Sequence, residues 1–495
     1  MSRNESARRK RSTALVAIVA ALAIAVGGFV VGRVTTHSDS SRFKNTAATR
    51  PAPTTVSTSA STPGIEGPGS TAQTWSLVRD PDGGLRVVRG SPVRGLRPNT
   101  VEASGATVLS VETDIPERTL APTPTEAAAV ENDPMRSQQW ALDQTSFERA
   151  WSATRGAGVV VAVVDTGVDA GHRDLGSVVL PGIDYISSAH DGRYDGNGHG
   201  THVAGIIAAQ VNNGVGIAGA APSVRILPVR VLDGSGSGVS SNVAAGIIWA
   251  ADHGAQVINL SLGGGVSPAL QIAMQYARRK GAVVVAAAGN NGASGNDPVY
   301  PGAYPEAIAV GAFDSHLARA SFSNTGAYVD VSAPGDTILS TWPTPQSSYA
   351  LLSGTSMATP YVSAEVALIR SVNRALTPAA VTYILESTAR PAGRGGTDAE
   401  FGHGLIDPAA AVLAARPKVA GYGTKGTGYW IVAPGGGVRS YGNARVYGNA
   451  TSGGSPVVAS ARTATGRGYW LVAANGAVYA FGDAHSYADG VHPCA

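Results

Sequence analysis

The sequence predicts an α/β fold built on a mostly parallel β-sheet. Two apolar runs, Val159–Val164 and Val283–Ala288, have the length and composition of strands that are buried on both faces. Apolar residues at helical spacing follow His199 and Ser356. Strands that alternate with helical segments are typical of parallel crossover units, so we expect helices to cover the sheet.

Three short motifs place reactive side chains at the ends of these elements. They are V-A-V-V-D-T-G around Asp165, G-H-G-T-H-V-A-G around His199 and S-G-T-S-M-A-T-P around Ser356. Asp165 ends a strand, and open α/β sheets bind ligands just outside the carboxyl ends of their strands. A serine hydroxyl becomes a good nucleophile when an imidazole takes its proton and a carboxylate orients the imidazole. The motifs therefore favour nucleophilic catalysis.

Each motif also has a simpler structural interpretation. Asp165 could cap the next turn, and Ser356 could be an ordinary helix N-cap. His199 and His202 are three residues apart, which leaves a zinc pair as an alternative. Because no glutamate stands between or beside them, as it does in the zinc-protease motif, we expect His202 to pack within its helix.

The order Asp, His, Ser and the surrounding strings resemble the subtilisin-like serine protease family over residues 133–415. The resemblance implies a three-layer α/β/α fold with a mostly parallel sheet. It implies that Ser356 is the nucleophile, His199 the general base and Asp165 the carboxylate that orients His199. It also implies that Asn290 donates to the oxyanion, although an asparagine after a strand is also a common turn residue. No catalytic cofactor is implied.

A protease must also hold an extended peptide. Val257–Leu262 predicts a strand, and the three glycines that follow it would let a substrate strand pair closely. The loop Asp233–Gly238 resembles the opposite wall of the family's binding site. We therefore expect substrate contacts at Ser261, Leu262, Gly263 and Gly236, while both segments are also ordinary glycine-rich turns.

A calcium site is implied by the same resemblance. The implied ligands are Asp174, Val211, Asn213, Val215 and Ile217. One carboxylate, one amide and several backbone carbonyls are hard oxygen ligands, which suit calcium rather than zinc. A plain polar loop is the alternative. The ligand that the family takes from its mature amino end has no clear counterpart in the sequence.

The amino-terminal region predicts export. Residues 1–12 contain the basic cluster Arg8–Arg11, and the following Ala14–Val31 contains no charged residue. About 20 apolar residues can span a bilayer, and the basic side stays cytoplasmic. We expect a cytoplasmic tail at 1–12 and a single-pass signal-anchor at 13–32, with the catalytic domain extracellular. A cleaved signal peptide, which would give a secreted protein, is the alternative.

Three further regions follow. Residues 33–70 are rich in Ser, Thr and Pro and predict a flexible linker. Residues 71–132 contain short apolar pieces and resemble the inhibitory prosegment of the family, followed by a linker, but the region is shorter than a typical prosegment. The catalytic domain is then expected to cover residues 133–415.

Residues 416–495 contain an internal repeat. G-Y-W-I-V-A begins at Gly428 and returns as G-Y-W-L-V-A at Gly468, a period of 40 residues. Aromatic strands separated by glycine turns are typical of propeller blades or small repeat modules. The two units predict a β-rich region that pairs with another chain, binds a cell-envelope polymer or has no ligand. The single cysteine, Cys494, excludes an internal disulfide and leaves an intermolecular one open.

Composition narrows the function. The net charge of +3 is small and concentrated near the amino end, which argues against nucleic-acid binding. A hydrophobic content of 43% argues against wholesale disorder. The sequence therefore predicts an exported serine endopeptidase that acts on protein or peptide substrates. The alternative is an envelope-associated binding or scaffold protein with an inactive protease domain.

Overall fold

A computed structural model describes residues 74–89, 98, 106–119, 125–126, 133–343, 348–394, 396–416, 418–422, 428–433, 435–450, 457–463, 465–473 and 477–485. The predicted tail, signal-anchor and linker, residues 1–70, lie outside these ranges, as does Cys494. Within the described ranges, no helix has the length and apolar character needed to cross a bilayer.

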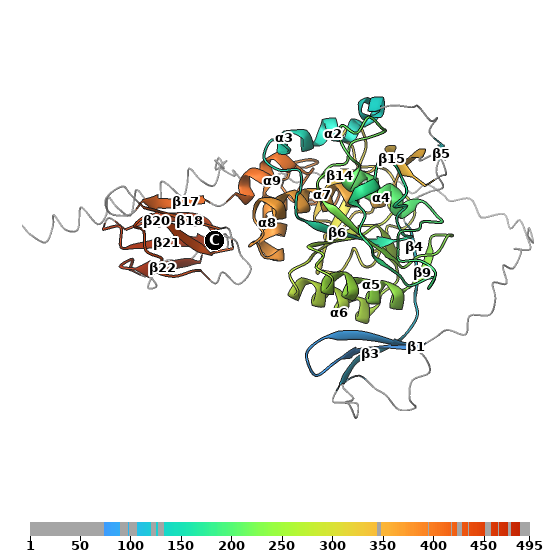
Figure 1. Cartoon of the computed structure of the whole chain (residues 1–495), viewed down its shortest axis with the longest axis horizontal. Coiled ribbons are helices and arrows are strands. Elements are labelled where there is room, and N and C mark those ends of the chain that lie inside the picture. Colours follow the sequence, from blue (N-terminus) through green and yellow to red (C-terminus); the bar gives the residue numbers. More distant parts are fainter. Residues whose placement is uncertain are drawn as a thin grey trace, which may run out of the picture. The chain divides into compact units, whose positions relative to one another are not determined.

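Seven parallel strands form the central sheet (Figure 1), as the apolar runs predicted. In spatial order they are β14 (Val331–Pro334), β13 (Ala307–Phe313), β12 (Val283–Ala287), β10 (Val257–Leu260), β6 (Val160–Asp165), β8 (Arg225–Arg230) and β7 (Ile183–Asp184). The central strands are buried on both faces. Their carboxyl ends therefore share one edge of the sheet.

Helices cover both faces of the sheet and complete the predicted three-layer α/β/α architecture. α4 (His199–Ala208) and α7 (Thr355–Val372) share one hydrophobic core with Val161 and Val163 of β6. α5 (Ser240–Asp252) and α6 (Pro268–Arg279) share another with Ala162 and Val164. Successive residues of a strand point to opposite faces, so one strand contributes to both cores. The shorter helices are η1 (Asp133–Gln138), α2 (Trp140–Thr145), α3 (Phe147–Ala150), η2 (Gly176–Val178), α8 (Pro378–Thr388) and α9 (Pro408–Ala415).

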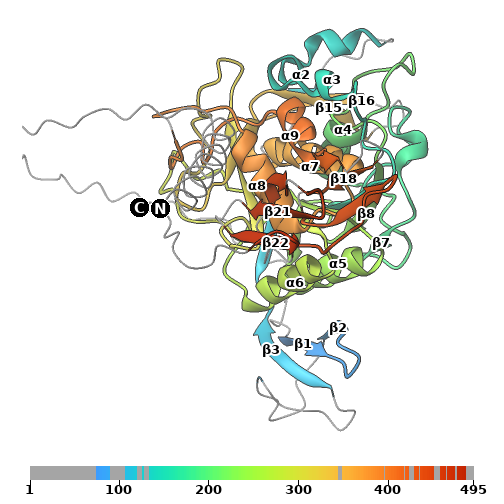
Figure 2. The same cartoon turned by 90° about the vertical axis from the view of Figure 1, so that its left-hand side faces the viewer.

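A separate antiparallel sheet precedes the catalytic domain in the chain. It contains β1 (Thr74–Arg79), β2 (Leu85–Arg89) and β3 (Thr107–Thr113) in the order β2-β1-β3. Figure 2 shows these strands beside α5 and α6, and Trp75, Leu77 and Leu85 join the core of those helices. We call β1–β3 the leading sheet.

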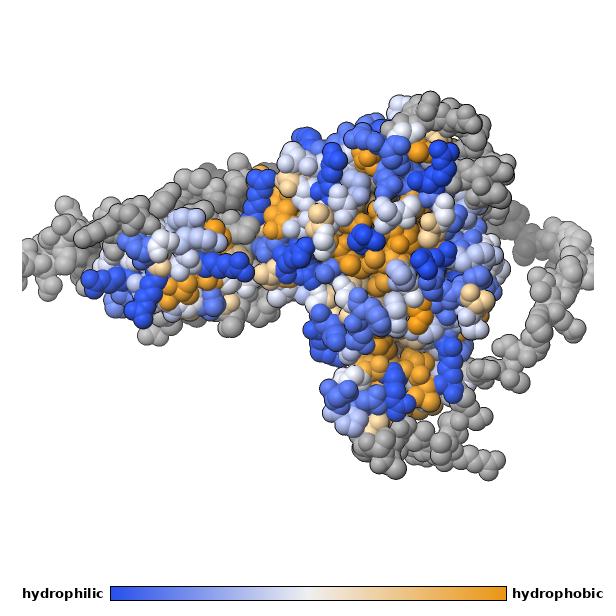
Figure 3. Space-filling model, in the orientation of Figure 1, coloured by the Kyte–Doolittle hydropathy of each residue, from blue (hydrophilic) through white to orange (hydrophobic). Residues whose placement is uncertain are grey.

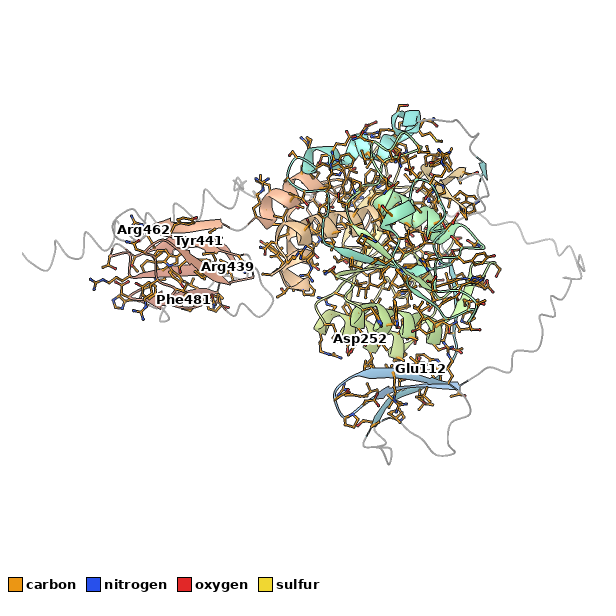
Figure 4. All side chains as sticks on the ribbon, in the orientation of Figure 1. Glu112, Asp252, Arg439, Tyr441, Arg462 and Phe481 are labelled. Carbon is orange, nitrogen blue, oxygen red and sulfur yellow. The ribbon has the colours of Figure 1, made fainter. Side chains whose placement is uncertain are left out.

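Two carboxylates connect the leading sheet to helix amino ends. Glu112 accepts hydrogen bonds from Ser267 Oγ (2.6 Å) and from the Ala269 backbone N–H (2.7 Å) at the start of α6. Figure 4 shows Glu112 on the leading sheet. Asp114 Oδ1 accepts one from the Ser241 backbone N–H (3.1 Å) in the first turn of α5. Negative groups are favoured at helix amino ends, so these contacts help to fix the leading sheet on α5 and α6.

The chain then enters the catalytic domain as an added strand. β4 (Pro116–Thr119) lies between β9 (Ser237–Val239) and β11 (Leu262–Gly264) and is antiparallel to both. β5 (Thr125–Glu126) pairs with β16 (Ser348–Leu352), which pairs with β15 (Ile338–Trp342). The segment after β4 thus contributes a strand to the catalytic domain before residue 133.

The C-terminal region consists of two three-stranded antiparallel sheets, which confirms the predicted β-rich region. The first contains β17 (Lys418–Tyr422), β18 (Tyr429–Val432) and β19 (Val438–Tyr441), and the second β20 (Val457–Arg462), β21 (Gly468–Ala473) and β22 (Val478–Gly482). Trp430 and Val432 of the first sheet share a small core with Tyr469 and Leu471 of the second. Figure 3 shows that hydrophobic residues also reach the surface of this region.

One buried carboxyl group stands out in the catalytic domain. Glu365 of α7 is fully buried, and within the described residues its two carboxyl oxygens have no hydrogen-bond partner. Burial raises its pKa well above the usual value, and the nearby charge of Asp407 raises it further. In these surroundings the folded chain favours the neutral, protonated form of the carboxyl over the charged form.

We expect Glu365 to make the fold less stable as the pH rises. An acid whose pKa is raised on folding costs nothing below its unfolded pKa and about 1.4 kcal/mol per pH unit above it, until the folded pKa is reached. Urea unfolding of the Ser356→Ala chain between pH 5 and 8 should include this loss beside that of other buried carboxyls such as Glu117, and adding Glu365→Gln should make the loss per pH unit smaller by up to about 1.4 kcal/mol. Glu400→Gln, which changes an exposed glutamate, should retain it. The same pH slope in Glu365→Gln would contradict the assignment.

Candidate active site

Asp165 and His199 form a buried pair at the carboxyl edge of the sheet. Asp165 ends β6, His199 is the first residue of α4, and His199 Nδ1 lies 2.7 Å from Asp165 Oδ1. α4 approaches β6 closely because it carries Gly200, where a Cβ atom would lie 2.0 Å from the Gly167 carbonyl oxygen. A carboxylate on Nδ1 holds the imidazole so that Nε2 is the basic nitrogen. Within the described residues, Nε2 of His199 has no hydrogen-bond partner.

Asp195 fixes the two segments that carry this pair. Its Oδ1 accepts hydrogen bonds from Thr166 Oγ1 (2.9 Å) and the Gly198 backbone N–H (2.8 Å). Its Oδ2 accepts from the Thr201 N–H (2.9 Å) and hydroxyl (2.7 Å). Burial raises the pKa of Asp195, and these four hydrogen bonds oppose that rise. Sequence reasoning missed Asp195, although an Asp four residues before His199 is a recognisable signal for capping the start of a helix.

Ser356 lies in the first turn of α7 and is tied to the end of β10. Its hydroxyl donates to the Ser261 carbonyl (2.9 Å), and the Ser261 hydroxyl donates to the Ser356 carbonyl (2.8 Å). The contacts continue inward, because Asn259 Nδ2 donates to Ser261 Oγ (2.9 Å) and Ser363 Oγ donates to Asn259 Oδ1 (2.8 Å). All four residues are fully buried. This polar chain, which the sequence did not reveal, sets the position of the α7 amino end.

Asn290 lies just after β12 and faces the same helix start. Its carboxamide oxygen accepts hydrogen bonds from the Thr355 backbone N–H (2.9 Å) and from the Thr355 hydroxyl (2.8 Å). Thr355 is the residue before Ser356. Because the oxygen is held in this way, the orientation of the carboxamide is fixed and its NH₂ group is the end directed away from Thr355.

His202 has a structural role, as the sequence predicted. Its Nε2 lies 3.1 Å from the carbonyl oxygens of Ile338 and Ala350, so this nitrogen is the protonated donor that joins α4 to β15 and β16. Burial lowers the pKa of His202 to about 3, with a smaller contribution from His199. In the part of the chain that the structure describes, no three His, Cys, Asp or Glu residues gather as a metal site. The zinc alternative therefore has no structural basis in these residues.

Three of the four predicted substrate-contacting residues contact β4. Leu262 pairs with Thr119 and Gly263 with Arg118, while the Thr119 N–H donates to the Gly236 carbonyl (3.0 Å). The fourth, Ser261, bonds to Ser356 instead. β9 and β11 are referred to below as the binding strands. They hold one extended segment of the chain between them by backbone hydrogen bonds.

Glu117 occupies an unusual place in β4. The flanking Pro116 and Arg118 are exposed, whereas Glu117 is fully buried and its carboxyl oxygens have no hydrogen-bond partner within the described residues. A Cβ atom at Gly264 of β11 would lie 2.7 Å from Glu117 Oε2, so the absence of a side chain there makes room for the carboxyl. Burial alone raises the pKa of Glu117 well above the usual value.

Two of the predicted calcium ligands, Asn213 and Ile217, hydrogen-bond to a third, Asp174. Its Oδ1 accepts a hydrogen bond from Asn213 Nδ2 (2.7 Å), and its Oδ2 accepts from the Ile217 N–H (2.9 Å) and the Tyr349 hydroxyl (3.2 Å). The Val215 N–H donates to Asn213 Oδ1 (2.8 Å). The loop is tight, since a Cβ at Gly216 would lie 2.5 Å from Asp174 Oδ2. The structure thus brings a buried carboxylate and the side chain of Asn213 to one loop, and both are oxygen donors of the kind calcium prefers.

Comparisons with known proteins agree with this geometry. Thermitase of Thermoactinomyces vulgaris is 49% identical over 260 residues, which cover 52% of this chain and 91% of that protein. Subtilisin E of Bacillus subtilis is 46% identical over 259 residues, or 52% of this chain and 66% of that protein. An extracellular protease of Xanthomonas campestris is 42% identical over 364 residues, or 63% of this chain and 60% of that protein.

The family model described as "Subtilase family" matches residues 156–404, a range that contains Asp165, His199, Asn290 and Ser356. This range covers the central sheet from β6 to β14 together with α4 to α8. The chain therefore belongs to the subtilase family and is a subtilisin-like serine endopeptidase.

Proposed function

We propose that this endopeptidase hydrolyses peptide bonds through Ser356, His199 and Asp165 by way of an acyl-enzyme intermediate. The observation that carries the proposal is the 2.7 Å contact between His199 and Asp165 at the start of α4, which shares its core with α7, the helix that carries Ser356 in its first turn. The alternative of an inactive scaffold is not favoured, because each residue that the chemistry requires is present.

The contacts of Asp165 with His199 and of Asn290 with the start of α7 support these roles. Asp165 holds the Nδ1–H of His199, so Nε2 is the nitrogen that removes the Ser356 proton. The hydroxyl of Ser356, which donates to the Ser261 carbonyl in the structure, must turn to Nε2 as it attacks the substrate carbonyl. The negative charge that develops on the carbonyl oxygen is stabilised by the NH₂ group of Asn290 and by the amino end of α7. Nε2 then returns the proton to the leaving amine, and water releases the acyl group.

We propose that residues 71–119 are an inhibitory prosegment. β4 pairs with both binding strands, so a substrate strand cannot occupy them at the same time. The buried apolar side chains of the leading sheet and its contacts with α5 and α6 support the same role. Because β5 already pairs with β16, we place the maturation cut between Thr119 and Thr125, closer to the amino end than the boundary at 132 that the sequence suggested.

We also propose a structural calcium ion held by Asp174, Asn213 and the backbone carbonyls of Val211, Val215 and Ile217. When bound, the ion would stabilise this loop and take no part in the reaction. We propose further that the protein acts outside the cell, which the basic and apolar start of the sequence supports. A relative is named an extracellular protease.

Ser356→Ala tests the proposed function directly. The variant should lose peptidase activity and labelling by a fluorophosphonate reagent, while its circular dichroism spectrum stays unchanged. Ser321→Ala, which alters an exposed serine, should keep both the peptidase activity and the labelling. Hydrolysis by Ser356→Ala at the wild-type rate would refute the assignment, and a wild-type chain that is never labelled would favour the scaffold alternative.

Asn290→Ala should lower kcat by about 100- to 1000-fold with little change in KM, because the lost donor acts on charge that appears only in the transition state. This magnitude is the one known for the corresponding loss in subtilisin rather than one derived from this structure. Steady-state hydrolysis of a peptide substrate measures it. Asn291→Ala, which removes the neighbouring carboxamide, should leave kcat within a few-fold of wild type.

The prosegment should loosen as the pH rises, because Glu117 is buried without a partner. The pKa of Glu117 is higher when β4 lies between the binding strands than when it is free. The binding of β4 is therefore strongest below the pKa of a free glutamate, about 4.3. Above it, the equilibrium constant for this binding falls by up to about tenfold per pH unit until the pKa of the bound state is reached. Tyr304 interacts electrostatically with Glu117, and a tyrosine supplies no positive charge that would favour the carboxylate. Hydrogen exchange at the amides of residues 117–119 in the full Ser356→Ala chain, corrected for intrinsic rates, measures the effect.

In that experiment Glu117→Gln should remove the pH dependence. Arg118→Gln is the matched control, because its side chain is exposed on the same strand, and it should keep the pH dependence. An equal pH slope with Glu117 and with Gln at this position would exclude the buried carboxyl as the cause.

A further inference from the structure

The two C-terminal sheets are built from the same repeat but bury opposite faces. In the first sheet Trp430 and Val432 are buried, and Tyr429 and Ile431 are partly exposed. In the second sheet the equivalent positions are reversed, since Tyr469 and Leu471 are buried while Trp470 and Val472 are partly exposed. We call the sheet face that carries Trp430 or Trp470 the Trp face, and the face that carries Tyr429 or Tyr469 the Tyr face. The Trp face of the first sheet packs on the Tyr face of the second. Trp430 and Tyr469 have ring centroids 5.2 Å apart in this contact.

This stacking leaves the Trp face of the second sheet and the Tyr face of the first sheet on the outside. The outer face of the second sheet carries Trp470, Val472 and Val478, which are the equivalents of Trp430, Val432 and Val438 in the internal contact. The outer face of the first sheet carries Tyr429, Ile431 and Tyr441, which are the equivalents of Tyr469, Leu471 and Phe481, and the exposed Arg439 at the position of Tyr479. Val478 is 58% exposed and Tyr441 is 42% exposed, so both outer faces present apolar side chains to solvent. Figure 4 shows Tyr441 and Phe481 on the two sheets.

The outer faces keep the local geometry of the inner ones. The indole N–H of Trp430 donates to the Arg445 carbonyl (2.8 Å), and that of Trp470 donates to the His485 carbonyl (3.0 Å), the same fifteen-residue separation. Tyr429 and Tyr441 stack at 5.0 Å, as Tyr469 and Phe481 pair at 5.5 Å. The open Trp face is thus shaped like the face that already binds a Tyr face inside the module.

We propose that the Trp470 face of one copy of this chain docks on the Tyr429 face of a second copy. The intermolecular contact would repeat the internal one, with Trp470 against Tyr429 in place of Trp430 against Tyr469. Repeat units that bury a core between neighbours need their end faces covered, and a second copy supplies a complementary cover for each. Because the two faces differ, the contact is heterologous and gives rings or open chains rather than an isolated two-fold dimer.

The difference between the two faces makes a complementation test possible. Val478→Lys adds charge to the Trp face, and Ile431→Lys adds charge beside Arg439 on the Tyr face. Each variant, made in the full Ser356→Ala chain, loses one face and keeps the other. Sedimentation in a mild detergent, which keeps the apolar amino-terminal stretch dispersed, reports the mass over a concentration series. Val446→Lys is the control, because Val446 is 38% exposed but lies between β19 and β20 rather than on either face.

The Ser356→Ala chain and the Val446→Lys control should assemble as concentration rises, and each face variant alone should remain a monomer. An equimolar mixture of the two face variants should form a one-to-one dimer and nothing larger, since only one intact pair of faces remains. That dimer also shows that both modules are folded. A parent chain that stays monomeric would overturn the proposal, as would face variants that assemble like the parent or a mixture that fails to associate. None of these outcomes depends on the proteolytic chemistry.

Discussion

The position of α7 against β10 is the constraint on which the site depends. A buried chain of hydrogen bonds runs from Ser363 through Asn259 and Ser261 to Ser356 and joins the helix to the strand. Buried polar groups of this kind are costly unless each is paired, so the arrangement tolerates little change in register. This chain of hydrogen bonds positions the Ser356 hydroxyl. Asp195 positions the start of α4, which carries the His199 imidazole.

The same edge of the sheet also carries β4, the strand of the prosegment that we propose to be inhibitory. β10 is followed directly by β11, so the residues that fix Ser356 lead into one of the two binding strands. β4 completes an antiparallel sheet with β9 and β11 and is held by backbone hydrogen bonds that any extended peptide could make. Glu117 is the buried side chain of this strand, and because it has no hydrogen-bond partner within the described residues, burial raises its pKa.

Three buried carboxyl groups show how the fold treats charge. Asp195 accepts five hydrogen bonds and organises the site. Glu117 and Glu365 lack such partners within the described residues, and burial raises the pKa of each. Burial without hydrogen bonds favours the neutral form of an acid, so we expect the protonation of Glu117 and Glu365 to change the stability of the fold with pH. Asp195 instead holds its neighbours rigidly in place.

The sequence by itself determined the α/β class and the positions of Asp165, His199, Asn290 and Ser356 at the ends of strands or the starts of helices. These features follow from local periodicity and from motifs a few residues long. The roles of Asp195 and Asn259 and the burial of Glu117 arise from distant partners, 147 residues away in the pairing of Glu117 with Gly264, which a local pattern does not specify. The two C-terminal repeats show most clearly what a local sequence pattern leaves undecided. Gly-Tyr-Trp followed by Ile-Val or Leu-Val occurs in both β18 and β21, yet one buries its tryptophan and the other its tyrosine, because the neighbouring sheet lies on opposite sides.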